Sequence, residues 1–136
     1  MSHLRREMDG AESTFKRWVP FAVFLCLCTG IVIGADRGTL SAALGWINSI
    51  PFFDKAGHII LIGTLAFLLN YALAGRRLGP LQLGGLIVAV VMTLEEYSQS
   101  WFPARTCSVA DLMANYTGVL CAEIAWRIVS RDRRRS

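Results

Sequence analysis

The sequence predicts an all-α, polytopic membrane protein with four transmembrane helices. Hydrophobic residues make up 54% of the 136 residues and charged residues 18%, which is more apolar and less charged than soluble domains are. Long apolar runs also recur along the chain, each close to the ~20 residues with which a helix crosses ~30 Å of hydrocarbon. At this length the chain forms one domain at most. The runs cover residues 18–35, 56–74, 81–94 and 109–129.

The alternative fold is a soluble bundle of buried helices. Such helices would need polar faces that meet water, and these runs show none. The fourth run is the weakest by hydropathy, because Asp111, Asn115 and Glu123 interrupt it. The composition still favours a bilayer as the solvent.

Basic residues give the predicted orientation. The positive-inside rule counts Lys and Arg in short loops near the ends of spans. Eleven of the 14 basic residues precede the first run, separate the second from the third, or end or follow the fourth, whereas Arg37, Lys55 and Arg105 lie on the other side. Both termini are therefore predicted to be cytoplasmic. The predicted segments are a mobile polar N-terminus at 1–15, the transmembrane domain at 16–130 and a basic cytoplasmic tail at 131–136.

The net charge of +4 and the basic tail have an explanation in the membrane alone. Arginines next to a span are attracted to anionic lipid headgroups. Six residues after a span offer no element that could read a nucleic-acid groove. We therefore expect a lipid partner and no nucleic acid.

The four cysteines predict neither a disulfide nor a metal site. Three of them lie within spans and only Cys107 lies in an outer loop, so no disulfide can form within one chain outside the membrane. The spacing typical of zinc ligands is also lacking. No metal or other cofactor is predicted.

The first run is expected to remain in the protein. A basic segment precedes it and it ends in Gly34 and Ala35, a pattern that a signal peptidase could cleave. The run is long for a signal peptide, however, and cleavage would leave three spans. Pro20 falls near the expected helix start, where its missing N–H does little harm. Gly30 and Gly34 form a GxxxG pair that lets a neighbouring backbone approach closely.

Residues 36–53 form a long, partly apolar outer loop. We expect a short amphipathic segment at the membrane interface with Trp46 at headgroup depth. The second span begins after it with Asp54 and Lys55. His58 follows four residues after Asp54, on the same helix face and one turn deeper.

The remaining spans differ in where their polar residues fall. A tight cytoplasmic turn is expected at 75–80, and the third span then runs from 81 to about 99. Its acids, Glu95 and Glu96, come only near the outer end. The fourth span has small residues at intervals of four, which form a seam along which another helix can pack. These are Ala114, Gly118 and Ala122.

Polar side chains from three spans are therefore predicted to share one layer near the outer face. Ionisable groups at this depth cost a few kcal/mol each unless they face the bundle interior and find partners. We expect a polar pocket open to the extracytoplasmic side, with Glu96 and Arg105 as its central pair, because arginine can hold a carboxylate or phosphate through two hydrogen bonds. The predicted ligand-binding residues are Asp54, Lys55, His58, Glu96, Gln99, Arg105, Asp111 and Asn115.

Structural roles remain open for several of these residues. His58 could pair with Asp54 to hold helices together instead of binding a ligand. Asp111 could cap the fourth helix. Asn115 is expected to hydrogen-bond between helices. Aromatic residues near span ends, Trp126 among them, are expected to anchor at the interface.

These polar residues fall into three sequence motifs. The motifs are D-K-x-x-H (Asp54, Lys55, His58), E-x-x-Q followed by F-P-x-R-T (Glu96, Gln99, Arg105), and D-x-x-x-N-x-x-G (Asp111, Asn115, Gly118). Their spacing over about 50–122 resembles the VanZ-like family of small bacterial membrane proteins, named for a teicoplanin-resistance protein. Glu95 lies outside the motifs. The resemblance implies a four-helix protein of the bacterial cytoplasmic membrane, in a family whose founding member lowers sensitivity to a lipoglycopeptide antibiotic.

Three functions remain. The resemblance favours a protein that binds or shields a lipid-linked envelope component or a lipoglycopeptide. The second is a membrane enzyme acting on a lipid-linked cell-wall or polysaccharide substrate, with His58, Glu96 and Arg105 as candidate catalytic residues. The third is a small transporter, which is disfavoured because the first run carries no acidic residue. The small-residue seams also leave a homo-oligomer open.

Overall fold

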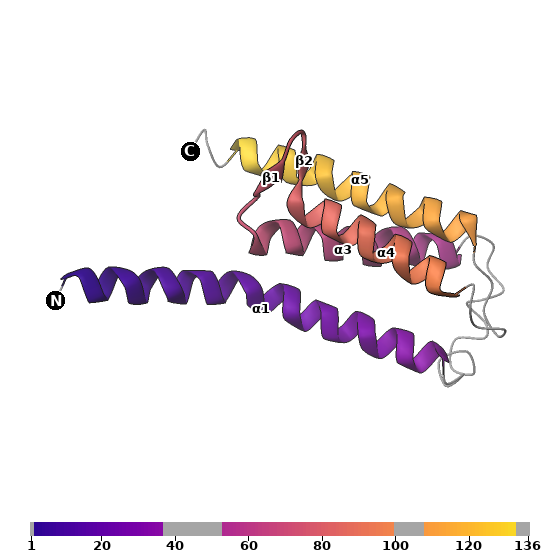
Figure 1. Ribbon diagram of the computed structural model, residues 1–136, viewed down its shortest axis with the longest axis horizontal. Helices are drawn as coiled ribbons and strands as arrows, with labels where there is room; N and C mark the ends of the chain where they lie inside the picture. The colour runs from indigo at the N-terminus through magenta and orange to yellow at the C-terminus, as the bar shows by residue number, and fades with distance from the viewer. Residues whose placement is uncertain (1, 37–52, 100–107, 133–136) are drawn as a thin grey trace.

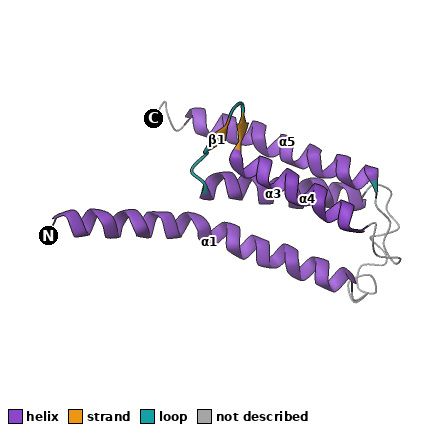
Figure 2. Ribbon diagram, viewed as in Figure 1, coloured by secondary structure: helices purple, strands orange, loops and turns teal. Residues whose placement is uncertain are grey.

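The fold was analysed in a computed structural model that describes residues 2–36, 53–99 and 108–132. Helices dominate these residues, so the all-α prediction is confirmed (Figure 2). Two helices contain segments long and apolar enough to cross a membrane, Glu12–Ile31 and Lys55–Ala72. The elements are α1 (Ser2–Asp36), α3 (Phe53–Ala72), β1 (Arg77–Leu78), β2 (Leu81–Gln82), α4 (Leu83–Gln99) and α5 (Val109–Asp132).

The helix α3 is the centre of the bundle. It contacts α1, α4 and α5, and successive helices alternate in direction, so that α3 and α5 run parallel (Figure 1). The bundle therefore has two unlike ends. We call the one where α3 and α5 begin the Asp111 end, and the opposite one, with β1 and β2, the hairpin end.

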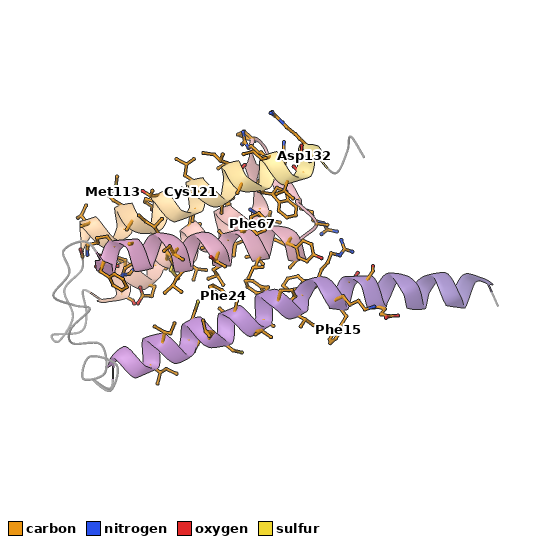
Figure 3. All side chains as sticks on the ribbon, turned by 180° about the vertical axis from the view of Figure 1, so that it is seen from behind. Phe15, Phe24, Phe67, Met113, Cys121 and Asp132 are labelled. Atoms are coloured by element: carbon orange, nitrogen blue, oxygen red, sulfur yellow. The ribbon has the colours of Figure 1, made fainter. Side chains whose placement is uncertain are left out.

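The buried core is small and most large apolar side chains point outward. Leu65, Ala66 and Leu69 of α3 form its centre, and Phe21 and Phe24 of α1 pack against it. Side chains project from every helix face (Figure 3). An exposed apolar surface of this extent marks a membrane or protein contact. Side chains between 52% and 62% exposed include Val90, Leu94, Leu120, Ile124 and Ile128.

The contact between α3 and α5 is made by backbone. A Cβ atom added to Gly118 would lie 2.6 Å from the Ile59 carbonyl oxygen and 2.9 Å from the Gly63 nitrogen, so no larger residue fits. Ala114 and Ala122, on the same face, are buried. The predicted small-residue seam on the fourth helix is confirmed. Among the described residues, Gly30 of the first helix makes no such contact, since it is exposed and has nothing within 4 Å of its added Cβ, so the GxxxG pair stays a prediction.

Two predictions about the first helix are wrong. Residues 2–15 are helical and continuous with the apolar run, because this segment is rich in helix formers and Lys16 pairs with Glu12 at 2.7 Å. Pro20 lies inside α1 and not near its start. The ribbon of α1 bends near its middle (Figure 1), as expected where proline removes a helix hydrogen bond.

The predicted tight turn is a short β-hairpin preceded by a helix cap. Ala74 has φ 54° and Gly75 φ 66°, and the Gly75 N–H donates to the Asn70 carbonyl at 2.8 Å, which is a Schellman motif. Arg77 then pairs with Gln82 across the hairpin, so α4 begins at Leu83 and not at the expected 81. The expected interfacial segment at 36–53 lies almost wholly outside the described residues.

Candidate functional site

An ion pair joins the first turns of α3 and α5 at the Asp111 end. The Lys55 ammonium contacts Asp111 Oδ1, and the two side chains are 32% and 21% exposed. The helices α3 and α5 run parallel and begin at the same end of the bundle, so Lys55 and Asp111 in their first turns lie side by side. The pair therefore stands at the rim of the bundle, where water or a headgroup can reach it.

One turn deeper, His58 and Asn115 make a second contact between the same helices. His58 Nδ1 lies 3.0 Å from Asn115 Oδ1, and the Asn115 side chain is buried. The expectation that Asn115 hydrogen-bonds between helices is confirmed. This contact also orients the imidazole, because one ring nitrogen is held by the amide.

The third helix contributes through the cap of α5. Ser108 precedes α5, and its Oγ accepts a hydrogen bond from the Asp111 N–H at 3.3 Å. Glu96 is 3% exposed, and its Oε1 accepts the Ser108 N–H at 2.5 Å. The cap residue is therefore Ser108, and the alternative reading of Asp111 as the cap is wrong.

This arrangement departs from a capping box in an informative way. In a capping box the acid at the third helical position accepts the N–H of the cap residue, and Asp111 holds that position. Here Glu96 of α4 accepts this N–H instead. The Asp111 carboxylate is consequently directed to Lys55.

Five of the predicted site residues thus lie at one end of the bundle. Glu96, Ser108, Asp111 and Lys55 form a continuous chain of contacts across three helices, with His58 and Asn115 below it. The side chains of Asp54 and Gln99, and all of Arg105, lie outside the described residues. The Glu96–Arg105 pair therefore stays a prediction.

The chemistry available at this end is that of a cation, a carboxylate and an oriented imidazole. Within 2–36, 53–99 and 108–132, no group of three or more His, Cys, Asp or Glu side chains could hold a metal ion. Two clefts among these residues lie elsewhere, one at the hairpin end and one on the apolar face between α4 and α5. The predicted polar pocket also stays a prediction.

The structure shows a second polar cluster, at the hairpin end, that the sequence analysis did not identify. Glu123 Oε1 accepts hydrogen bonds from Arg127 Nε and Nη2 at 3.0 and 2.8 Å. Arg127 Nη2 also donates to the Pro80 carbonyl at 2.9 Å, and the Gln82 N–H donates to Glu123 Oε2 at 3.3 Å. The hairpin is thereby fastened to α5. The spacing of Glu123 and Arg127, four residues apart on one helix, was the available signal.

Two buried amides complete that cluster. Asn70 and Gln82 are 0% exposed, and Asn70 Oδ1 accepts the Gly85 N–H at 3.1 Å. Asn70 Nδ2 and both Gln82 amide atoms have no hydrogen-bond partner within the described ranges. A Cβ at Gly84 would lie 2.4 Å from Asn70 Oδ1, so glycine is required where α4 meets α3.

The comparisons with known proteins identify a family. A family model described as VanZ/LLP1 matches residues 8–130. That range includes most of α1 and α5, all of α3 and α4, and both polar clusters. No curated protein and no solved structure matches the chain.

Proposed function

Because this chain belongs to the VanZ/LLP1 family, we propose that it is a multi-pass protein of the bacterial cytoplasmic membrane that binds or shields an envelope component through its Asp111 end. In this proposal all four helices cross the bilayer and the Asp111 end faces outward. The ligand is a lipid-linked cell-wall or polysaccharide precursor, or a lipoglycopeptide held at the outer leaflet. An effect on glycopeptide susceptibility would follow.

Membrane insertion is supported by the distribution of apolar and basic side chains. The helices expose large apolar side chains that hydrocarbon would cover. Arg77 lies in β1 with Arg76 just before it, and Arg127 contacts the hairpin at Pro80, so all three lie at the hairpin end, and positive residues favour the cytoplasmic side. The Asp111 end is then extracytoplasmic.

The observation that carries the binding proposal is the Lys55–Asp111 pair, linked to Glu96 through Ser108. A partly exposed ion pair contributes only about 0.2–1 kcal/mol to stability. The pair nevertheless occupies the rim, with Asp111 diverted from the capping role by Glu96. An anionic headgroup that displaces the Asp111 carboxylate would gain the Lys55 ammonium as a partner.

An enzymatic function is the second candidate, and the His58–Asn115 contact favours it. General acid–base catalysis needs a base whose ring is held in position by a further group, and Asn115 holds the His58 ring at 3.0 Å. The substrate class would be the same as for the binder. Incubation with a lipid-linked cell-wall precursor separates the two candidates, since an enzyme converts many equivalents and a binder protects about one.

Binding can be tested with purified protein in nanodiscs and a lipid-linked cell-wall precursor. Lys55→Gln should weaken binding at least tenfold with little change in thermal stability, whereas Asp111→Asn, which removes the carboxylate that competes with the anion for Lys55, should strengthen it. Lys16→Gln, which breaks the exposed Lys16–Glu12 pair, is the matched control and should bind as the unaltered protein does. Unchanged binding in both site variants would refute the proposal.

A further inference from the structure

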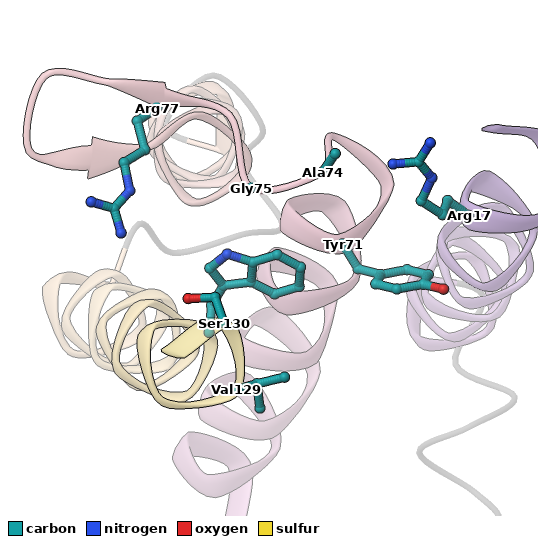
Figure 4. A pocket seen from close by; sticks show the side chains of 8 residues that line it. Arg17, Tyr71, Ala74, Gly75, Arg77, Val129 and Ser130 are labelled. Carbon is teal, nitrogen blue, oxygen red and sulfur yellow. The ribbon is translucent and has the colours of Figure 1, made fainter. Parts of the chain in front are cut away.

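The hairpin end contains a cleft that the proposed function does not use. It lies where α1, α3, α5 and the hairpin come together (Figure 4) and has a volume of about 310 Å³. It is at the opposite end of the bundle from Lys55 and Asp111. The lining residues are Arg17, Tyr71, Ala74, Gly75, Arg77, Trp126, Val129 and Ser130.

Two guanidinium groups from separate elements flank this cleft. Arg17 comes from α1 and Arg77 from β1, and they lie on opposite sides of it (Figure 4). No carboxylate is among the lining residues. Lys16 and Arg127 each have an acidic partner, whereas no carboxylate within the described ranges pairs with Arg17 or Arg77. Two cations facing one cleft without a counter-charge favour an anion between them.

The wall between the arginines is aromatic and fixed in position. The rings of Tyr71 and Trp126 are edge to face with centroids 6.4 Å apart, and Phe67 supports Trp126 from 5.6 Å. Gly75 lies against the indole, because a Cβ there would be 2.7 Å from Trp126 Nε1. An aromatic ring with one apolar and one polar edge suits the depth at which lipid headgroups meet hydrocarbon.

Apolar side chains continue from the cleft along α5. Val129 lines it and is partly exposed, and Ile128 beside it is more than half exposed. A ligand with both a charged head and an apolar body could therefore lie along the helix. Free phosphate carries the same anionic group as a lipid headgroup, but it has no apolar body and would leave this surface uncovered.

We propose that this cleft binds the phosphate headgroup of an anionic membrane lipid, with Arg17 and Arg77 as its partners. Arginine binds phosphate through paired hydrogen bonds, and basic pockets between spans on the cytoplasmic side bind such headgroups. The site requires that the hairpin end lie at a membrane surface. It does not depend on any ligand of the Asp111 end.

The test compares lipid retention by two double variants in native mass spectrometry. Protein is exchanged into micelles with equal amounts of phosphatidylglycerol and phosphatidylcholine. The unaltered chain should retain phosphatidylglycerol preferentially, and Arg17→Gln with Arg77→Gln should lower its apparent affinity roughly tenfold, because the charge-assisted hydrogen bonds of both guanidinium groups to the phosphate are lost. Arg76→Gln with Arg131→Gln removes the same charge outside the cleft lining and should change affinity little.

Each other outcome contradicts the proposal in its own way. Equal losses of phosphatidylglycerol affinity in the two double variants would mean that the lipid is attracted by the positive charge of this end in general and not by the cleft. Equal retention of the two lipids would mean that no headgroup is selected. Full displacement of the lipid by millimolar inorganic phosphate would identify free phosphate as the occupant. If the glutamine variant does not fold, Arg17→Lys with Arg77→Lys keeps the charge and should still weaken binding several-fold through loss of paired hydrogen bonds.

Discussion

The two ends of the bundle use charged residues in opposite ways. At the hairpin end, Glu123 is buried and its carboxylate holds both Arg127 and the Gln82 backbone. At the Asp111 end, the Lys55–Asp111 pair stands at the rim and is partly exposed. The first arrangement fastens the hairpin to α5, and the second leaves a pair that water can reach. The contrast shows that similar charged residues have different surroundings at the two ends, a buried acid with fixed partners at one and a partly exposed pair at the other.

The first prediction concerns which end of the bundle faces the outside of the cell, where the largest effect is expected. In a chain whose other cysteines are replaced by alanine, Cys107 should react with a membrane-impermeant thiol reagent in intact cells. A second chain carrying Arg76→Cys as its single cysteine should react only after the membrane is opened. The reverse pattern would place the hairpin end outside and invert the proposed orientation.

Loss of the buried acid should give the largest change in stability. Glu123→Ala leaves the buried Gln82 N–H without its acceptor and removes the carboxylate partner of the partly exposed Arg127, so we expect a loss of about 2–4 kcal/mol in the free energy of unfolding. Thermal or denaturant unfolding in detergent measures it. Glu12→Ala, which removes an exposed partner of Lys16, should cost under about 1 kcal/mol. Similar losses of unfolding free energy in the two variants would mean that burial of the acid makes no difference to its contribution.

The helix contact between the two ends gives the next largest effect. Gly118→Ala should destabilise the bundle by about 1–3 kcal/mol, because the new methyl group would lie 2.6 Å from the Ile59 carbonyl oxygen. Gly30→Ala is the matched control, since nothing lies within 4 Å of its Cβ. It should be neutral or stabilising by up to about 1 kcal/mol. Equal destabilisation would argue against a backbone contact between α3 and α5.

At the Asp111 end, stability and binding should separate. Lys55→Gln should change the free energy of unfolding by less than about 1 kcal/mol while weakening binding of a lipid-linked precursor at least tenfold, because the proposed partner of the anion is lost. Calorimetric binding and unfolding measured on the same preparation test this. A large loss of stability without loss of binding would assign the pair to the scaffold.

The smallest effect concerns the cap before the hairpin. Ala74 has φ 54° at a position that most often carries glycine. Ala74→Gly should therefore stabilise the protein by about 0.5–1 kcal/mol. A drop in the unfolding temperature would mean that the Ala74 side chain, which lines the lipid cleft, makes contacts that outweigh its backbone strain.

The sequence was sufficient for the helical fold class and for much of the Asp111 end. Lys55 with His58, and Asp111 with Asn115, have spacings of three and four residues, which place each pair on one helix face. The two pairs face each other because α3 and α5 run parallel and begin at the same end of the bundle. The small residues at 114, 118 and 122 likewise have a regular spacing, and the structure places them in the contact.

Other features have no regular signal in one sequence. The role of Glu96 depends on where the loop before α5 places the Ser108 N–H, and residue types do not fix that position. Asn70 and Gln82 are single amides in or beside apolar runs, so periodicity does not reveal them. The strands of the hairpin have two residues each, which is too short for an alternating pattern. The early start of α1 was missed because a polar helix has no apolar stripe.

The contact of Gly63 with Gly118 lies between the two polar ends of α3 and α5. Each of these glycines would clash with the other helix if it carried a Cβ, so the two backbones are in direct contact there. The helices cannot slide along one another or turn about their axes without losing this fit. The separation between the Lys55–Asp111 pair and the Glu123 cluster is therefore set by the helices themselves and not by the loops that join them.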